Sequence, residues 1–231
     1  MRTAAALAAL VLVAACGERP EPDLGPPPVP PTPTAVAPTP APNEAVDGEQ
    51  GASGGWREVV STEDASRLGR LDQAWRLARA EAEDKGFAAR VEALGPLVDP
   101  NAGLAGGLQP GPGVYRCRTI KLGSNGPGGV AFLEYPWFRC AVELTPGGDL
   151  VLTKASGSQR TRGRLHPDTD RRLIFIGAQA WGADETGWPT YGQMPERDQV
   201  GVFERVGPDR WRLVIPWPRV EAKLELLELA K

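Results

Sequence analysis

The sequence predicts an α+β fold, in which an N-terminal helical segment packs on an eight-stranded antiparallel meander. The meander is expected to form an up-and-down β-barrel, with a strongly curved sheet as the alternative. Apolar residues recur at three- and four-residue steps from Leu68 to Ala82, and the period changes to two after residue 113. Short turns rich in Gly, Pro and Asp separate the alternating segments, as between antiparallel neighbours. Closure would remove the sheet edges that favour aggregation.

The first sixteen residues combine a positive start, a short apolar run and a cysteine. The run from Ala4 to Ala15 is shorter than the about 20 residues of a permanent transmembrane helix, so residues 1–15 are interpreted as a signal peptide. The tetrapeptide VAAC (13–16) resembles the lipobox of bacterial lipoproteins, which are cleaved before the cysteine. The resemblance implies that Cys16 carries a thioether-linked diacylglycerol and an amide-linked acyl chain, which together anchor firmly. A plain secreted protein with an incidental cysteine is the alternative.

The segment that follows is interpreted as a lipidated N-terminus and a disordered linker, residues 16–55. Pro, Ala, Thr and Gly dominate it, and it has too little apolar surface to offset the entropy of ordering. Its prolines favour extended polyproline II at about 3.1 Å per residue, which would hold the next domain off the bilayer. Gly17 occupies the position where aspartate favours inner-membrane retention in lipoproteins, so the resemblance implies the outer membrane, facing the periplasm of a bacterial envelope.

Charge is concentrated in this linker. Residues 17–55 hold six acidic side chains and one arginine, whereas residues 56–231 are almost neutral. Because no basic surface is expected, nucleic acid is excluded as a partner. The remaining partners are a membrane through the anchor on Cys16, an envelope protein, the cell wall or a small ligand.

The helical segment is expected over residues 56–110. Ser61 and Asp64 form the pattern of a capping box, and Gly86 is placed to end the helix that follows. A second, shorter helix is expected to end at Gly95-Pro96. The apolar residues that define the two helices are Leu68, Leu71, Trp75, Ala78 and Ala82, then Phe87, Val91 and Leu94.

The antiparallel β domain is expected over residues 111–231. β-Branched and aromatic residues are frequent in its alternating segments. By topology alone, such a meander is similar to the calycin barrels. The segment 124–134 fits none of the expected strands. These strands are expected at 113–123, 137–145, 150–156, 160–166, 171–179, 198–206, 210–216 and 223–229.

Two cysteines remain besides Cys16. Cys117 and Cys140 fall on the apolar faces of the first two expected strands, and an exported protein can form disulfides. If these strands pair, the two residues are cross-strand neighbours within disulfide range, and we expect a bridge between them. No CXXC motif is present and histidine is nearly absent, so we expect neither a metal nor a cofactor.

Several motifs in order, GPGVYRCRTIKLG, YPWFRC, KASGSQRTRGRL, DQVGVFERVG and RWRLVIPWP, resemble a domain-of-unknown-function family of bacterial envelope proteins. The resemblance covers roughly residues 56–229. It implies an exported protein with a helical stretch and a β-rich body, and it carries no known activity or assigned site residue.

The most distinctive polar cluster is GSQRTRGR (157–164). Arg160 and Arg162, with the backbone of the preceding turn, are weak candidates for binding an anionic group. The favoured alternative is structural. Glu204 shares a strand face with valines, so it is expected to point inward and to form a buried ion pair with Arg160.

The glycine-rich connection 180–198 is too long for a tight turn. Trp181, Trp188 and Tyr191 in it are candidate ligand-binding residues, since long loops over a barrel mouth often bind ligands. The same rings are equally suited to plugging one end of the barrel.

No catalytic constellation is predicted. His166, the only histidine, lies in an expected hairpin turn, where a solvated side chain is usual, and Asp168 and Asp170 lack the further ligands of a calcium loop. The sequence therefore favours a lipid-anchored, non-enzymatic binding or interaction module. A periplasmic hydrolase using His166 as acid/base and a purely structural cell-wall protein are the alternatives.

Overall fold

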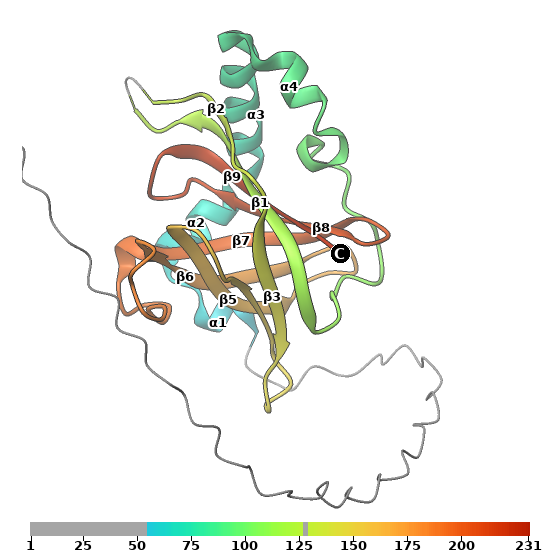
Figure 1. Cartoon of the computed structure of the whole chain (residues 1–231), viewed down its shortest axis with the longest axis vertical. Coiled ribbons are helices and arrows are strands. Elements are labelled where there is room, and N and C mark those ends of the chain that lie inside the picture. Colours follow the sequence, from blue (N-terminus) through green and yellow to red (C-terminus); the bar gives the residue numbers. More distant parts are fainter. Residues whose placement is uncertain (1–54, 127–128) are drawn as a thin grey trace, which may run out of the picture. The chain divides into compact units, whose positions relative to one another are not determined.

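The computed structural model describes residues 55–126 and 129–231, and these contain a closed antiparallel barrel with a few helices (Figure 1). The barrel strands pair in chain order, and the last pairs back with the first, which confirms the predicted eight-stranded barrel. The predicted signal (1–15), Cys16 and the linker up to residue 54 lie outside the described residues. The barrel strands are β1 (Gly113–Ser124), β3 (Phe138–Leu144), β4 (Leu150–Lys154), β5 (Gln159–Pro167), β6 (Leu173–Trp181), β7 (Asp198–Gly207), β8 (Arg210–Pro216) and β9 (Ala222–Ala230).

The segment 124–134, which fits none of the expected strands, contains the end of β1 and a further strand, β2 (Phe132–Glu134). β2 pairs with the far half of β1, with Ile120 opposite Glu134, whereas β3 pairs with its near half. Phe132 stacks on Phe87 of the helical segment, with ring centroids 5.5 Å apart. A strand of three residues is too short for its periodicity to be recognised in the sequence.

Apolar side chains fill most of the barrel interior. They include Tyr115, Leu152, Phe175, Phe203, Leu213 and Leu229, one from each of six strands. Cys117 and Cys140 belong to the same cluster and form the predicted disulfide, with their Cα atoms 5.8 Å apart. They are diagonal neighbours, because Cys117 lies opposite Phe138 and Tyr115 lies opposite Cys140.

The helical segment covers part of the barrel's outer face. Trp75, Ala78 and Val91 pack on Ile120 and Leu224, while residues at the start of the segment pack against Val202 on β7. None of the helices in the described residues is both long and apolar enough to span a bilayer. The elements are α1 (Trp56–Val59), α2 (Thr62–Gly69), α3 (Leu71–Ala82), the π-helical turn η1 (Glu83–Phe87), α4 (Ala88–Glu92) and the 3₁₀ helices η2 (Gly95–Val98) and η3 (Pro195–Arg197).

The start of α2 confirms half of the predicted capping box. Ser61 Oγ accepts a hydrogen bond from the backbone N–H of Asp64 at 3.2 Å. The Asp64 carboxylate does not return the bond: it pairs with the buried Arg67, and the Ser61 N–H donates to the Tyr191 hydroxyl at 3.0 Å. The single helix predicted between Ser61 and the stop at Gly86 is divided at Arg70 into α2 and α3.

The predicted ion pair between Glu204 and Arg160 is wrong. The Glu204 carboxylate lies 2.7 Å from Nη2 of Arg212 on the adjacent strand β8. Glu204 does share a face with the valines of β7, but that face is the outer one, beneath the helical segment. Arg160 instead donates to backbone carbonyls of the 182–185 loop.

Arg212 ties the helical segment to the barrel. Its side chain is fully buried, and its guanidinium lies 5.2 Å from the centre of the Trp75 ring. Nη1 donates to three carbonyl oxygens at the end of η2, those of Pro96, Leu97 and Asp99, at 2.9, 3.0 and 2.6 Å. The unpaired carbonyls that follow a helix are thereby satisfied by one side chain from the barrel.

Replacing Arg212→Met should lower the free energy of unfolding by about 3–5 kcal/mol, because Glu204 and the carbonyls after η2 lose their partner in a buried site. Urea unfolding followed by tryptophan fluorescence measures this. Arg210→Met on the same strand is the control, since Arg210 is part-exposed and its partner Glu228 keeps Arg118. Equal stability of both variants would contradict the role of Arg212.

Candidate functional site

The inward-facing positions change from apolar to polar toward one end of the barrel. On β4, Leu150 and Leu152 are followed on the same face by Lys154, and on β9, Leu229 and Leu227 are followed by Glu225. All but one of the polar side chains at this end are buried, and Gln159 is half-buried. We call this group the polar end, and it comprises Lys121, Lys154, Gln159, Thr161, Gln179, Gln199 and Glu225.

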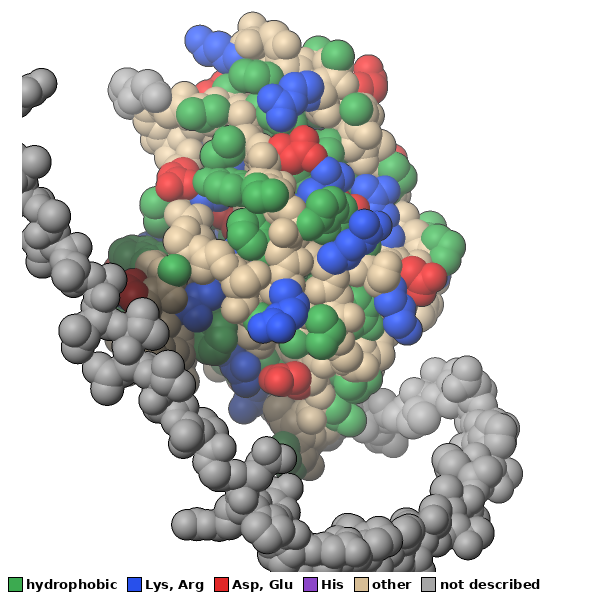
Figure 2. All heavy atoms as spheres, viewed as in Figure 1, with side chains coloured by type: hydrophobic (Ala, Val, Ile, Leu, Met, Phe, Trp, Pro, Cys, Tyr) green, Lys and Arg blue, Asp and Glu red, His purple; other side chains and the backbone are tan. Residues whose placement is uncertain are grey.

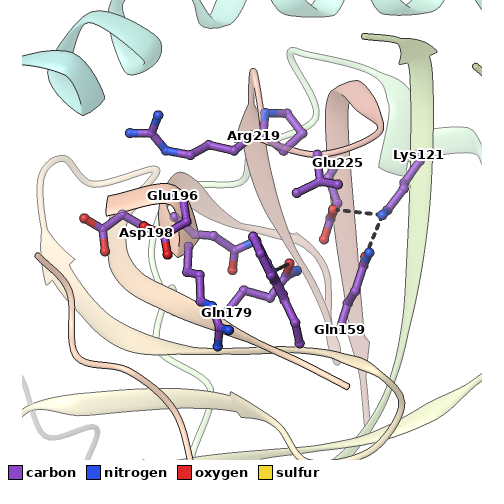
Figure 3. A pocket seen from close by; sticks show the side chains of 12 residues that line it. Lys121, Gln159, Gln179, Glu196, Asp198, Arg219 and Glu225 are labelled. Atoms are coloured by element: carbon purple, nitrogen blue, oxygen red, sulfur yellow. Dashed lines mark hydrogen bonds and ion pairs between the residues drawn. The ribbon is translucent and has the colours of Figure 1, made fainter. Parts of the chain in front are cut away.

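Lys121 lies between two carboxylates in the polar end. Its Nζ donates to Glu221. It also donates to Gln159 Oε1 at 2.6 Å and lies 3.7 Å from Oε2 of Glu225 (Figure 3). Burial opposes the ammonium charge, but the two carboxylates outweigh it and raise the pKa of Lys121. Burial also raises the pKa of the Glu225 carboxyl group.

Lys154 has a different environment. Its side chain is 5% exposed, its Nζ donates to the backbone carbonyl of Gln159 at 2.6 Å, and the ammonium lies 4.2 Å from the Phe138 ring centre. No ion pair joins it to a carboxylate within 4.0 Å among the described residues. Burial lowers the pKa of Lys154 to about 8, against the attraction of Glu225.

A hollow of about 170 Å³ adjoins Lys154. Phe138 and Tyr135 supply aromatic walls, and Thr119 and Ser158 supply hydroxyl groups. Glu221 also lines it, but its carboxylate is held by Lys121 and by Nε2 of Gln159, the latter at 3.3 Å. The hollow therefore combines a buried cation, hydroxyl donors and apolar surface.

A second, smaller hollow lies in the polar end, between Lys121, Gln179 and Glu225 (Figure 3). Its volume of about 10 Å³ suits a single water molecule. Thr161 Oγ1 donates to Gln199 Oε1 at 2.7 Å near it. With apolar packing filling the rest of the interior, the open side of the polar end is the part of the barrel suited to a ligand.

The predicted ligand-binding residues are divided between two places. The guanidinium groups of Arg160 and Arg162 lie 5.1 and 5.5 Å from the Trp188 ring centre, on the outer face of β5. Trp188, Tyr191 and Arg162 line an outer groove of about 450 Å³. Trp181 lies apart, at the polar end, where its indole N–H donates to Gln179 at 2.9 Å.

Tyr191 joins the long loop to the helical segment. Its hydroxyl donates to the Asp64 carboxylate and accepts the N–H of Ser61, so it fixes the start of α2. This is a structural role for one of the predicted ligand-binding residues, although its ring still borders the outer groove.

His166 and Asp168 are not solvated turn residues, contrary to expectation. His166 is 6% exposed at the end of β5, where burial lowers its pKa, so the imidazole is neutral at pH 7. Asp168 accepts a hydrogen bond from the Trp56 indole at 2.8 Å and pairs with Arg172 at 2.7 Å, which fixes α1. No group of three metal-ligating side chains is found in residues 55–126 and 129–231.

The face of the molecule drawn in Figure 2 has no single dominant charge. Figure 2 shows basic, acidic and hydrophobic side chains interspersed on one face of the molecule. Exposed charges of opposite sign are paired in places, as between Arg219 and Glu63 at 2.8 Å, and such exposed pairs are screened by water. Buried charges also occur outside the polar end, as in the pair of Asp64 and Arg67. The polar end is distinguished by Lys154, which has no carboxylate within 4.0 Å among the described residues.

Lys154 should make stability depend on pH in a defined direction. The folded-state pKa of about 8 lies below the ordinary 10.5, so between these values the folded protein binds fewer protons than the unfolded chain and stability rises with pH. Below pH 8 the ammonium is charged in the folded protein, and the full free-energy cost of burying it lowers the stability. Lys154→Met should therefore be more stable than wild type at pH 7, by of order 3 kcal/mol, with the difference shrinking toward pH 10.

Urea unfolding at pH 7, 8, 9 and 10 measures this difference. Lys85→Met is the matched control, because Lys85 is an exposed lysine on η1. Parallel stability profiles for wild type and Lys154→Met would show that the ammonium is not held unpaired.

Comparison with known proteins identifies a family but adds no activity. No curated protein and no solved structure matches the chain. Residues 56–229 match a family described as a domain of unknown function, DUF4893, and this range includes the helical segment, the barrel and the polar end. The chain therefore belongs to the DUF4893 family.

Proposed function

We propose that this protein is a lipid-anchored, non-enzymatic binding module of the bacterial envelope, with a small polar ligand bound at the polar end of its barrel. The observation that carries the proposal is the buried ammonium of Lys154 beside a hollow of about 170 Å³. A buried charged group without an opposite charge nearby lowers the stability of the fold. Its presence is explained more readily where a bound ligand supplies the opposite charge. The eight-stranded up-and-down topology supports a calycin-like barrel, in which ligands enter at one mouth.

The address in the envelope rests on the N-terminal sequence. The apolar run, the VAAC tetrapeptide and Gly17 support cleavage before Cys16, lipidation, and the outer membrane facing the periplasm. The disulfide between Cys117 and Cys140 supports an oxidising compartment. The proline-rich linker would let the barrel reach ligands, envelope proteins or the cell wall at a distance from the bilayer.

Two alternatives are weaker on the geometry. A periplasmic hydrolase would use His166, but this side chain is 6% exposed at the end of β5, on the outer face of the barrel and away from the polar end. A purely structural cell-wall protein would give no reason for burying an ammonium group without a carboxylate partner.

The lipid anchor is tested with Cys16→Ser. Wild type should incorporate labelled palmitate and fractionate with the outer membrane, while Cys16→Ser should lose the label and the membrane association, because the thioether site is absent. Gly17→Ser, which leaves the cysteine intact, is the control for lipidation. Unlabelled wild-type protein that retains Met1 would exclude the proposed address.

The binding function is tested by filling the hollow. Saturation-transfer NMR on the full chain, with a library of amino acids, sugars, short peptides and organic acids, should detect binding to wild type. Ser158→Trp should abolish it, since Ser158 lines the hollow on its exposed side. Ser66→Trp, at an exposed position of α2, should leave it unchanged. If no compound gives a binding signal that is present in wild type and lost in Ser158→Trp, the proposed binding function is wrong.

A further inference from the structure

We propose that the polar end binds the carboxylate of a small organic acid, with Lys154 as its counter-ion. This inference rests on the proposed binding function and adds the chemical class of the ligand. It follows from how charge is distributed among the buried groups and from the shape and chemistry of the hollow beside Lys154.

The buried charges of the polar end leave one cation without a close partner. Glu225, whose charge attracts Lys154, and Glu221, which lines the same hollow, are both engaged by Lys121, at 3.7 Å for Glu225. Lys154 donates a hydrogen bond to a neutral carbonyl, that of Gln159, so further donors of its ammonium are available to a ligand. Arg160 adds repulsion and Glu225 adds attraction at longer range, and neither neutralises Lys154 by contact.

An incoming carboxylate would supply the missing charge. A hydrogen bond between an ammonium and a carboxylate is about twice as strong as one between neutral groups, and burial strengthens it further. A neutral ligand of the same shape would leave the ammonium uncompensated. A cationic ligand is disfavoured, because Glu221 already bonds to Lys121 and Gln159.

The walls of the hollow indicate the rest of the ligand. Phe138 and Tyr135 present ring surface, while Thr119 and Ser158 present hydroxyls that can donate to a second carboxylate oxygen. A volume of about 170 Å³ accommodates a compact acid with a short apolar or aromatic body. Gly157 lies close to Lys154: a Cβ there would lie 2.9 Å from Nζ and 3.1 Å from the Phe138 ring. The ammonium is therefore packed against both the β4–β5 turn and the Phe138 ring.

The experiment compares acids with their amides on the full chain. Butyrate, benzoate, butyramide and benzamide are titrated at pH 7 by isothermal calorimetry and by NMR shift perturbation. The expected result is that each acid binds at least tenfold more tightly than its amide. Affinity for the acid should also fall as pH rises through about 8, where Lys154 loses its proton.

Two variants test whether Lys154 is the residue that binds the carboxylate. Lys154→Met should weaken benzoate binding at least tenfold, and Lys154→Gln should do so while keeping a hydrogen-bond donor. Lys85→Met, at the exposed control position, should bind benzoate as wild type does. Thermal melting of each variant establishes that the barrel is folded during the titration.

Three results would overturn the inference. Equal binding of acids and amides, blocked by Ser158→Trp, would refute the carboxylate assignment while the proposed binding function stands. Benzoate binding that is undiminished in folded Lys154→Met would place the anion elsewhere. No binding of any of the four compounds to wild type would also reject it, and the wider ligand library then decides the fate of the proposed function separately.

Discussion

Closure of the sheet between β1 and β9 is the constraint on which the rest of the structure depends. Their antiparallel register runs from Arg116 opposite Ala230 to Ser124 opposite Ala222. Once these strands pair, one face of every barrel strand is shut away from water and must be packed or compensated. Apolar residues and a disulfide meet this demand over most of the interior. At the polar end it is met by hydrogen bonds and ion pairs. Lys154 is the exception, because its ammonium donates to a carbonyl but has no carboxylate partner among the described residues.

The part of the barrel's outer face that the helices cover is also apolar. This arrangement uses a buried guanidinium as its link: Arg212 joins Glu204 on β7 to the carbonyls after η2. Asp168 and Asp64 play similar parts for α1 and α2, through Trp56 and Tyr191. The polar groups of the helical segment are thus satisfied by the barrel surface, so the two parts form one cooperative unit.

The candidate site was largely invisible in the sequence. Lys121, Lys154 and Glu225 come from three strands far apart in the chain, and each looks like the solvent-facing member of an alternating strand. One signal in the sequence could have revealed the site. Side chains alternate between the two faces of a strand, so Lys154 lies on the same face of β4 as Leu150 and Leu152. The same alternation led to the wrong partner for Glu204. Glu204 does share a strand face with valines, but both faces of β7 are buried, and alternation alone does not identify which face is the inner one.

The sequence by itself determined the elements and one bond. Period-two alternation and turn residues located all eight barrel strands to within about two residues, because these signals act locally. The same alternation placed Cys117 and Cys140 on the same face of two neighbouring strands, which was enough to predict their disulfide. Only the tertiary structure decided which face is inside, which arginine meets Glu204, and that Lys154 is buried beside a hollow. Those outcomes depend on barrel closure and helix packing, which bring together residues that no local pattern connects.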